Sequence, residues 1–362
     1  MISRRSFGLV GAAAFAASCQ KKRSAVYDVY IANEAGKAIA VVDLTAFALS
    51  RHIRLDDSPT MVIAPRGGSK VYALAPKTGT VYEIETDTLT VARKARVGPA
   101  ISMRLAGESL WVLGKRSLIE IRRDTFRQGQ IYSLPADAHD FDLSNRTNLA
   151  VVSYGAVGTL SVIHLSAKQI RPPVKVSDSI GMARFRLDGE GLLVADTANR
   201  RLCVLDQDAQ TIVNLPLAVR PDHLCFNQDG GQLFVTGEGR DAVVVIFPYY
   251  VPQVAETILA GHAPAAMAVS STHLFLTNPQ AGHITILDIA RRKIVGVTAV
   301  GADPGFVAIT PDGNYALVLN RQSGDMAVIL TSEIVDNGRK TAGLFTMIPV
   351  GSRPVSAAIR EA

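Results

Sequence analysis

The chain has 362 residues, of which 48% are hydrophobic and 19% are charged, so it can bury a large core and is not a disordered protein. Its formal net charge is +6, but no run of basic residues is interleaved with aromatic ones. The sequence therefore gives no indication that the protein binds nucleic acid.

Residues 1–18 predict a signal peptide. A basic start is followed by an apolar stretch, residues 7–17, which is too short to span a hydrocarbon core of ~30 Å as a helix. Residues 3–7, Ser-Arg-Arg-Ser-Phe, resemble the twin-arginine export motif. The sequence therefore predicts export from the cytoplasm.

Cys19 is the predicted site of lipidation. Residues 16–19, Ala-Ala-Ser-Cys, resemble the lipobox of bacterial lipoproteins, with alanine where that motif usually has leucine. The resemblance implies that Cys19 carries the lipid anchor and that residues 19–25 form the lipidated cysteine and a polar tether to the membrane. The alternative is an unmodified thiol beside an ordinary signal-peptidase site.

One phrase recurs through the rest of the chain. In residues 304–329 an apolar run is followed by Pro-Asp-Gly, a second apolar run, a polar turn and a third run, and similar phrases begin at residues 61, 181 and 222. Asp-Gly and Gly-Gly between short β-branched runs are typical of tight turns between antiparallel strands. Each repeat is therefore predicted to be a small antiparallel meander.

The repeats predict one all-β domain over residues 26–362, a β-propeller. Their starts are 39 to 50 residues apart, and a period of about 40–45 residues with four strands per unit is typical of propellers. The first unit, 26–58, lacks an innermost strand, whereas the tail 355–360 is such a strand without a unit, so joining them closes the ring. We expect eight four-stranded blades, or seven if unit 101–138 or unit 139–180 is irregular. The unit starts lie near Pro59, Pro99, Ala138, Ile180, Pro221, Pro264, Pro304 and Pro354.

Several repeats resemble the YVTN-type β-propeller repeat. The segments 29–33, 274–278 and 316–320 each precede a polar turn and a further strand, which ends near Asp43 in the first case and near Asp288 in the second. The resemblance covers nearly all of the mature chain and implies a WD40-like ring of the kind found in exported and surface proteins. That family usually has seven blades, so eight would be a departure.

A ligand-binding face is predicted where the loops between blades emerge together with the loops between second and third strands, here called the connector face. Loop residues held by a rigid frame are suited to binding. Most residues that open the inner strands are small or apolar, so the polar exceptions stand out. We expect the binding residues to be His139, Asp140, Asp222, His223, Asn33, Asn278, Asn320 and Arg321.

A second hypothesis is a lactonase-like hydrolase. Residues 220–224, followed by residues 234–238, resemble part of the lactonase-type propeller pattern, which implies that a histidine and a glutamate face the channel. His223 with Asp222 or Glu238 could then activate water against an ester carbonyl. The alternative is that Asp222 and His223 cap a strand end and that Glu238 is solvated.

Other chemistries lack a motif. The sequence contains no C-x-x-C-H, C-x-x-C, H-x-x-x-H, phosphate-binding G-x-x-x-x-G-K-[ST] or G-x-S-x-G. We therefore expect no cofactor and no metal, although His139, His223 and Glu238 could in principle meet across blades to hold one. Cys203 and Cys225 are expected to be two inert, unbonded thiols.

The sequence as a whole favours a non-enzymatic binding module of the cell envelope, located in the periplasm or outer envelope and anchored through Cys19. Its partner would be an envelope protein or a glycan, and the chain would act as a monomer. The aromatic pair Tyr249-Tyr250 could be a protein contact or could pack an outer strand.

Overall fold

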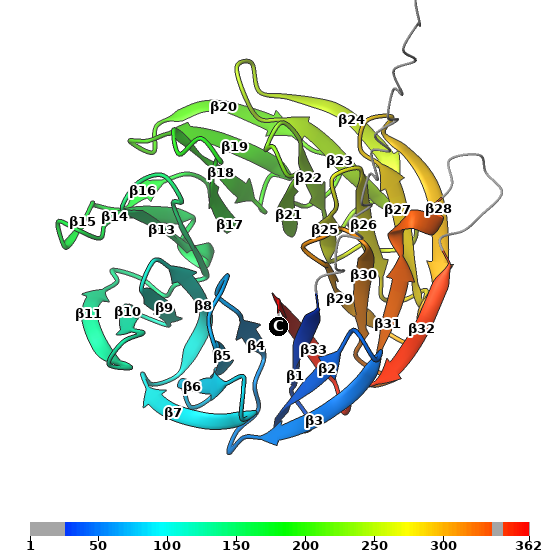
Figure 1. Cartoon of the computed structure of the whole chain (residues 1–362). Coiled ribbons are helices and arrows are strands. Elements are labelled where there is room, and N and C mark those ends of the chain that lie inside the picture. The colour runs from blue at the N-terminus through cyan, green and yellow to red at the C-terminus, as the bar shows by residue number, and fades with distance from the viewer. Residues whose placement is uncertain (1–25, 335–342, 362) are drawn as a thin grey trace, which may run out of the picture.

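The computed structural model describes residues 26–334 and 343–361, which form a ring of eight antiparallel sheets (Figure 1). The chain is an eight-bladed β-propeller. Within the described residues the only helical segments are two short turns, η1 (Gly155–Val157) and η2 (Thr331–Glu333). This part of the chain contains no helix long and apolar enough to cross a membrane. The predicted signal peptide and Cys19 lie outside the described residues.

The first four blades in chain order are as follows. The first contains β1 (Tyr27–Asn33), β2 (Ala38–Asp43), β3 (Ala48–Arg54) and β33 (Pro354–Glu361). The second contains β4 (Met61–Ile63), β5 (Lys70–Ala75), β6 (Thr80–Glu85) and β7 (Thr90–Arg96). The third contains β8 (Ala100–Ala106), β9 (Ser109–Gly114), β10 (Ser117–Arg122) and β11 (Arg127–Ser133). The fourth contains β12 (Asp140–Leu143), β13 (Leu149–Tyr154), β14 (Thr159–His164), β15 (Gln169–Ile170) and β16 (Val174–Lys175).

The other four blades each have four strands. The fifth contains β17 (Ile180–Phe185), β18 (Gly191–Asp196), β19 (Arg201–Asp206) and β20 (Thr211–Pro216). The sixth contains β21 (His223–Phe226), β22 (Leu233–Thr236), β23 (Ala242–Phe247) and β24 (Gln253–Leu259). The seventh contains β25 (Met267–Val269), β26 (His273–Asn278), β27 (His283–Asp288) and β28 (Lys293–Ala299). The eighth contains β29 (Pro304–Ile309), β30 (Tyr315–Asn320), β31 (Asp325–Leu330) and β32 (Leu344–Pro349).

The fourth blade, which the sequence marked as weak, is irregular only at its outer edge. Its outer strand is divided into β15 and β16, and Pro172 and Pro173 lie between them. Proline has no backbone N–H to donate, so this pair interrupts the ladder at a position where an edge strand tolerates it. The blade is nevertheless complete, so the count is eight rather than seven.

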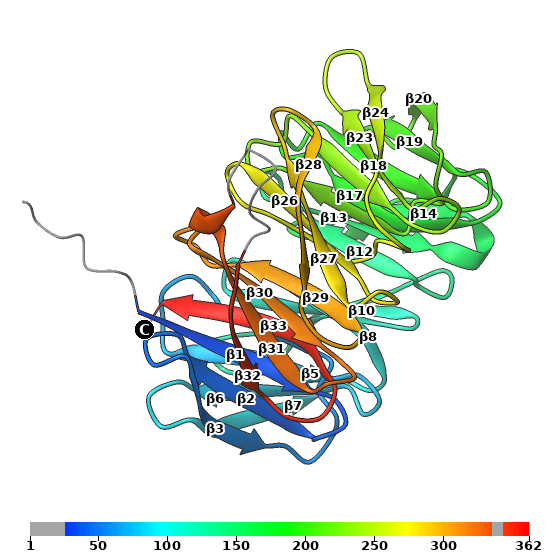
Figure 2. The ribbon, with the colours of Figure 1, turned by 90° about the vertical axis from the view of Figure 1, so that its right-hand side faces the viewer.

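The C-terminal strand closes the ring, as the sequence predicted. β33 pairs antiparallel with β1, with Tyr27 opposite Glu361 and Ile31 opposite Ala357. Figure 2 shows the two strands side by side. The pairing makes β33 the innermost strand of the first blade and gives β1 a partner on both sides, because β2 lies on its other edge.

The apolar core is divided into eight clusters, each of which lies between two neighbouring blades. The second and third strands of each blade are buried on both faces, which explains their continuous apolar runs, whereas the outer strands are largely exposed. In one example, Leu233 and Val235 of the sixth blade pack with Leu202 and Val204 of the fifth. Each blade is thus stabilised by burial against its two neighbours.

The two faces of the ring carry different loops. The turns between first and second strands, including the Asp-Gly turns at Gly189, Gly230 and Gly313, lie on what we call the turn face. These three glycines have φ values of 77°, 80° and 75°, which residues other than glycine rarely adopt. The connections between blades lie on the opposite, connector face, where each inner strand begins.

Candidate functional site

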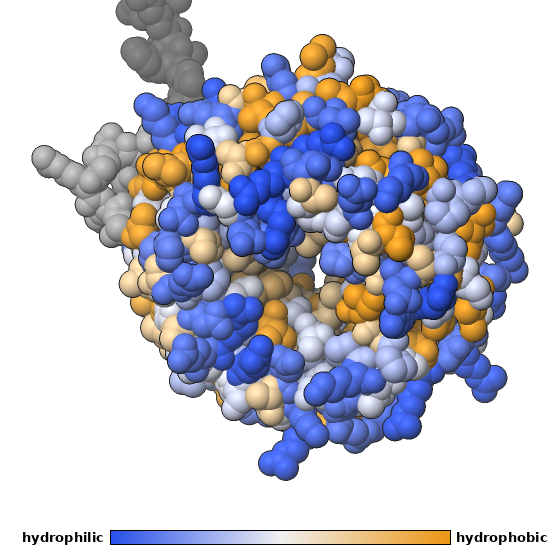
Figure 3. Space-filling view, turned by 180° about the vertical axis from the view of Figure 1, so that it is seen from behind, coloured by the Kyte–Doolittle hydropathy of each residue, from blue (hydrophilic) through white to orange (hydrophobic). Residues whose placement is uncertain are grey.

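Figure 3 shows the connector face, which is hollowed at its centre and largely hydrophilic around the rim. Two adjoining pockets lie on this face. One, of about 610 Å³, extends from η1 and the start of β17 to residues 220–222. The other, of about 430 Å³, extends from Asp222 and His223 to residues 263–265. Asp222 lines both, so it stands on the ridge between them.

Arg220 ties together the two carboxylates of the hydrolase hypothesis. Its Nε donates to Asp222 Oδ1 at 2.7 Å, and its Nη1 lies 2.6 Å from Glu238 Oε2. The second oxygen of Asp222 accepts the backbone N–H of Glu238 at 3.0 Å. The hydrogen bond to Asp222 raises the pKa of Arg220. Sequence reasoning had not singled out Arg220, although its place two residues before Asp222 was a usable signal.

Gly237 permits this arrangement. A Cβ atom at this position would lie 1.7 Å from the carbonyl oxygen of Arg220 and 2.8 Å from Asp222 Oδ2, so only glycine allows the approach. The backbone N–H of Arg220 also donates to the carbonyl oxygen of Glu238 at 2.6 Å. The loop after β22 is therefore held against the start of β21 by both backbone and side-chain bonds.

His223 opens β21 and is partly buried. Burial lowers the pKa of its imidazole, and the nearby charge of Asp222 opposes that shift. Within the described residues its ring makes no hydrogen bond, and Asp222 is bonded to Arg220 instead. The structure therefore brings Asp222, His223 and Glu238 to one pocket, but without a bonded histidine–carboxylate pair.

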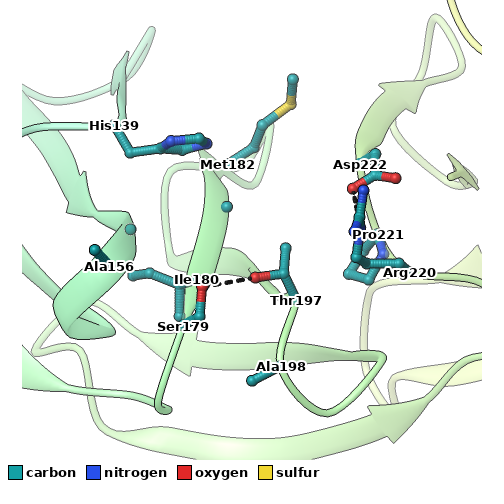
Figure 4. A pocket seen from close by; sticks show the side chains of 12 residues that line it. His139, Ala156, Ser179, Ile180, Met182, Thr197, Ala198, Arg220, Pro221 and Asp222 are labelled. Carbon is teal, nitrogen blue, oxygen red and sulfur yellow. Dashed lines mark hydrogen bonds and ion pairs between the residues drawn. The ribbon is translucent and has the colours of Figure 1, made fainter. Parts of the chain in front are cut away.

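The first pocket is bounded by polar groups on opposite sides, as Figure 4 shows. His139 lies on one side, Arg220 and Asp222 on the other, and Ser179 and Thr197 lie between them. The hydroxyls of Ser179 and Thr197 are 3.1 Å apart and hydrogen-bonded. The sequence analysis missed these two residues because a hydroxyl in a polar loop carries no motif.

His139 and Asp140 are adjacent in sequence, but their side chains lie in different surroundings. His139 is exposed at the rim of the first pocket. Asp140 is mostly buried and forms an ion pair with Arg184 of the adjacent inner strand β17. Of this pair, only His139 lines the pocket on the connector face.

The three asparagines expected on the binding face are buried at the ends of their strands. Asn33, Asn278 and Asn320 have exposed fractions of 1%, 0% and 0%. Asn33 Nδ2 donates to the carbonyl oxygen of Val350 at 2.6 Å, and Asn320 Nδ2 donates to Asp325 Oδ1 at 2.6 Å. Asn278 Nδ2 donates to Thr285 Oγ1 of the neighbouring strand at 3.0 Å. All three side chains are thus buried and bonded within the protein, and they are not exposed on the connector face.

Arg321 follows Asn320 and is partly exposed on the connector face. It forms two hydrogen bonds with the carboxylate of Asp303, at 2.6 and 3.0 Å. This two-point pairing joins the blade connection to the loop after β30. Arg321 lies in the eighth blade and lines neither of the two pockets described above.

Cys203 and Cys225 are both free, Cys203 buried and Cys225 partly so. Burial raises the pKa of their thiols, to about 11 and about 12 respectively. In the described part of the chain, no three His, Cys, Asp or Glu side chains gather as they would around a metal ion. His139 and His223 line different pockets.

Tyr249 and Tyr250, which were expected either to contact a protein or to pack an outer strand, differ in their exposure. Tyr249 is half-buried under the guanidinium of Arg186, which lies 5.0 Å from the ring centre. Tyr250 is fully exposed and has a φ of 56°. Both lie on the turn face, in the loop between β23 and β24, and line a pocket there.

No protein-family model matches the sequence, and no curated protein matches it either. Solved structures do match. Apo AztD from Citrobacter koseri is 12% identical, with a TM-score of 0.71 over 92% of this chain and 98% of its own. The dihydro-heme d1 dehydrogenase NirN, in complex with DHE, is 14% identical, with a TM-score of 0.72 over 91% of this chain and 74% of its own.

A third similar structure is a putative 6-phosphogluconolactonase from Bacteroides fragilis. It is 14% identical, with a TM-score of 0.63 over 93% of this chain and 99% of its own. At these identities the similarities establish the propeller fold alone. The three proteins carry very different names, so the shared fold does not indicate which function this chain has.

Proposed function

We propose that this protein is a non-catalytic binding module of the cell envelope, which presents its connector face to a protein or glycan partner. The observation that carries the proposal is the Arg220 network. The carboxylates of Asp222 and Glu238 are both paired with one guanidinium, so neither is poised to take a proton from water.

The shape of the connector face supports the same function. The larger pocket is lined in part by small residues, among them Gly155, Ala156, Gly181 and Ala198, which leave room for a ligand. Its polar groups are His139 and the Arg220–Asp222 pair, which lie on opposite sides. The face is supported by eight interlocked blade interfaces, so a partner would meet a nearly preformed surface.

The experiment compares two substitutions that add the same side chain on opposite faces. Ala198→Arg fills the connector-face pocket, and Glu190→Arg alters the exposed turn face. Tagged full-length chains would be recovered from envelopes of the source cells in mild detergent, and co-eluting proteins and glycans identified by mass spectrometry. We expect a partner that is retained by wild type and Glu190→Arg and lost by Ala198→Arg. Retention by both variants would contradict the proposal.

A hydrolase is the second candidate, and one observation favours it. The imidazole of His223 is kept neutral by burial and is unbonded among the described residues, as a general base would need. Catalysis would require a substrate to release Asp222 or Glu238 from Arg220. A panel of lactones and esters tests this: turnover that falls at least about 100-fold in His223→Ala would favour the hydrolase.

The envelope address is proposed from the sequence alone. The twin-arginine-like start, the lipobox-like residues before Cys19 and the resemblance to exported YVTN-type repeats support an exported, lipid-anchored chain. Fractionation of cells expressing wild type and Cys19→Ala tests it. We expect wild type in the membrane fraction and Cys19→Ala in the soluble periplasmic fraction, and membrane retention of both would contradict the anchor.

A further inference from the structure

A further cavity, of about 590 Å³, lies in the central channel and is lined by residues of the inner strands β4, β8, β12, β17 and β33. Figure 1 shows β4, β8, β17 and β33 around the centre of the ring. Its volume is within the range of ~300–1,000 Å³ that small-molecule sites occupy. Three arginines and one aspartate line it, namely Arg104, Arg184, Arg186 and Asp142. Each of these arginines is paired with a carboxylate, so the wall offers guanidinium N–H donors without a net positive charge.

Arg184 is fixed by its neighbours and still has donors to offer. Its Nη1 is paired with Asp140 and donates to the carbonyl oxygen of Ala183 at 2.8 Å. Its Nε and Nη2 make no hydrogen bond within the described residues. The side chain is 17% exposed and lines the channel cavity, whereas Asp140 does not line it. The Nε and Nη2 donors of Arg184 are therefore left unbonded in a fixed side chain that lines the cavity.

Arg104, on β8 of the third blade, is held by residues of β12 in the fourth blade, which lies between it and Arg184. Its Nε donates to the carbonyl oxygen of Phe141 at 2.7 Å, and its Nη1 is 3.5 Å from Asp142 Oδ1. Asp142 Oδ2 in turn accepts the backbone N–H of Phe185 at 3.0 Å. Burial lowers the pKa of Arg104, the positive charge of Arg184 lowers it further, and the negative charges of Asp142 and Asp140 oppose the shift. The two guanidiniums are thus close enough to interact, and a ligand oxygen between them could accept donors that their carboxylate partners leave unbonded.

Arg186 also lines the cavity, but its guanidinium is bonded to groups on the turn face. Its guanidinium is bonded to both oxygens of Asp188, at 2.7 and 3.3 Å, and lies over the ring of Tyr249. The rest of the cavity wall is largely apolar, with Met61, Ile63 and Phe306 among its residues. The cavity therefore combines a side that carries guanidinium donors with an apolar side.

We propose that the central channel binds a small organic carboxylate with an apolar body, whose headgroup is held by Arg104 and Arg184. The carboxylate would accept the free donors of the two guanidiniums in charge-assisted hydrogen bonds. The apolar body would contact Met61, Ile63 and Phe306. This site is separate from the connector-face pockets, so the inference goes beyond the proposed binding function and does not depend on it.

Calorimetric titration of the full chain tests the ligand class. The probes are octanoate and benzoate, their neutral analogues octan-1-ol and benzamide, and the headgroups acetate and inorganic phosphate. We expect both large carboxylates to bind, and all four other probes to bind at least about tenfold more weakly, since each lacks either the charge or the apolar body. Equal binding of a neutral analogue or of phosphate, or no binding of either carboxylate, would overturn the proposal.

Matched arginine variants locate the site. Arg104→Met and Arg184→Met each remove a channel guanidinium, and Arg321→Met removes a carboxylate-paired arginine outside the channel. We expect octanoate affinity to fall about tenfold or more in the first two and to stay unchanged in the third. Circular dichroism checks folding. If the methionine variants do not fold, Arg184→Lys keeps the charge without the planar fork, and its affinity should fall by more than about threefold. Unchanged affinity in the folded channel variants would refute the site.

Discussion

Asp196 shows how one polar residue at the end of a second strand organises a loop. Its side chain is fully buried and accepts hydrogen bonds from Ser177 Oγ at 2.7 Å and from the backbone N–H of Asn199 at 3.1 Å, and it is paired with Arg201. Burial alone would raise the pKa of Asp196, but the hydrogen bonds more than offset it and the pKa is lowered. The carboxylate is thus a structural anion.

Asp196→Asn is expected to lower the free energy of unfolding by about 2–3 kcal/mol at neutral pH, because the amide cannot accept all of these bonds. The effect has a definite pH dependence. A lowered folded-state pKa stabilises the chain above the unfolded-state value of ~3.9, and that contribution is lost as the pH falls through the folded-state pKa.

Urea titrations of wild type and Asp196→Asn at several pH values measure this difference. It should be constant above about pH 5 and shrink below about pH 4. Asp178→Asn is the control, because Asp178 is 95% exposed and its ion pair with Lys175, at 3.9 Å, is long and exposed and contributes little to stability. A control variant as unstable as Asp196→Asn, or a difference that grows in acid, would contradict the assignment.

At the scale of elements, the strands and turns could be predicted from the sequence because their signals are local. Alternating apolar runs and Asp-Gly turns placed the starts of the blades, and the unpaired tail predicted the closing role of β33. These features depend on neighbouring residues and on the period of the repeat.

The site could be predicted only in part, because side-chain partners come from other loops. Asn278 and Asn320 looked like loop residues, yet each packs against a glycine of a blade connection, Gly261 and Gly301. The network around Arg220 depends on the loop that contains Glu238. In contrast, Arg104 offered a usable signal, because it is a charged residue inside an inner strand, between Met103 and Leu105.

The closing strand makes a prediction of its own. Deletion of residues 354–362 removes β33 and leaves β1 as an unpaired inner edge, so we expect aggregation and a lower midpoint of thermal unfolding. A synthetic peptide of residues 352–362 should restore the midpoint when added in trans, and a scrambled peptide should not. A truncated chain that unfolds like wild type would contradict the role of β33.

At the scale of the whole molecule, eight blade interfaces support two separate surfaces. The connector face carries adjoining pockets that share Asp222. The channel carries the cavity lined by Arg104 and Arg184. The closed ring holds the residues of both surfaces in a rigid frame, as the two binding proposals made above require.

The most direct test of the central claim is a footprint of the bound partner by site-specific photo-crosslinking in cells. A photoreactive residue would replace Ala156, Met182 or Ala263 at the connector-face pockets, or Thr147, Glu190 or Asp229 on the turn face. We predict one common adduct from the three connector-face positions and none from the turn face. The same adduct from the turn face, or no adduct from any connector-face position, would contradict the account.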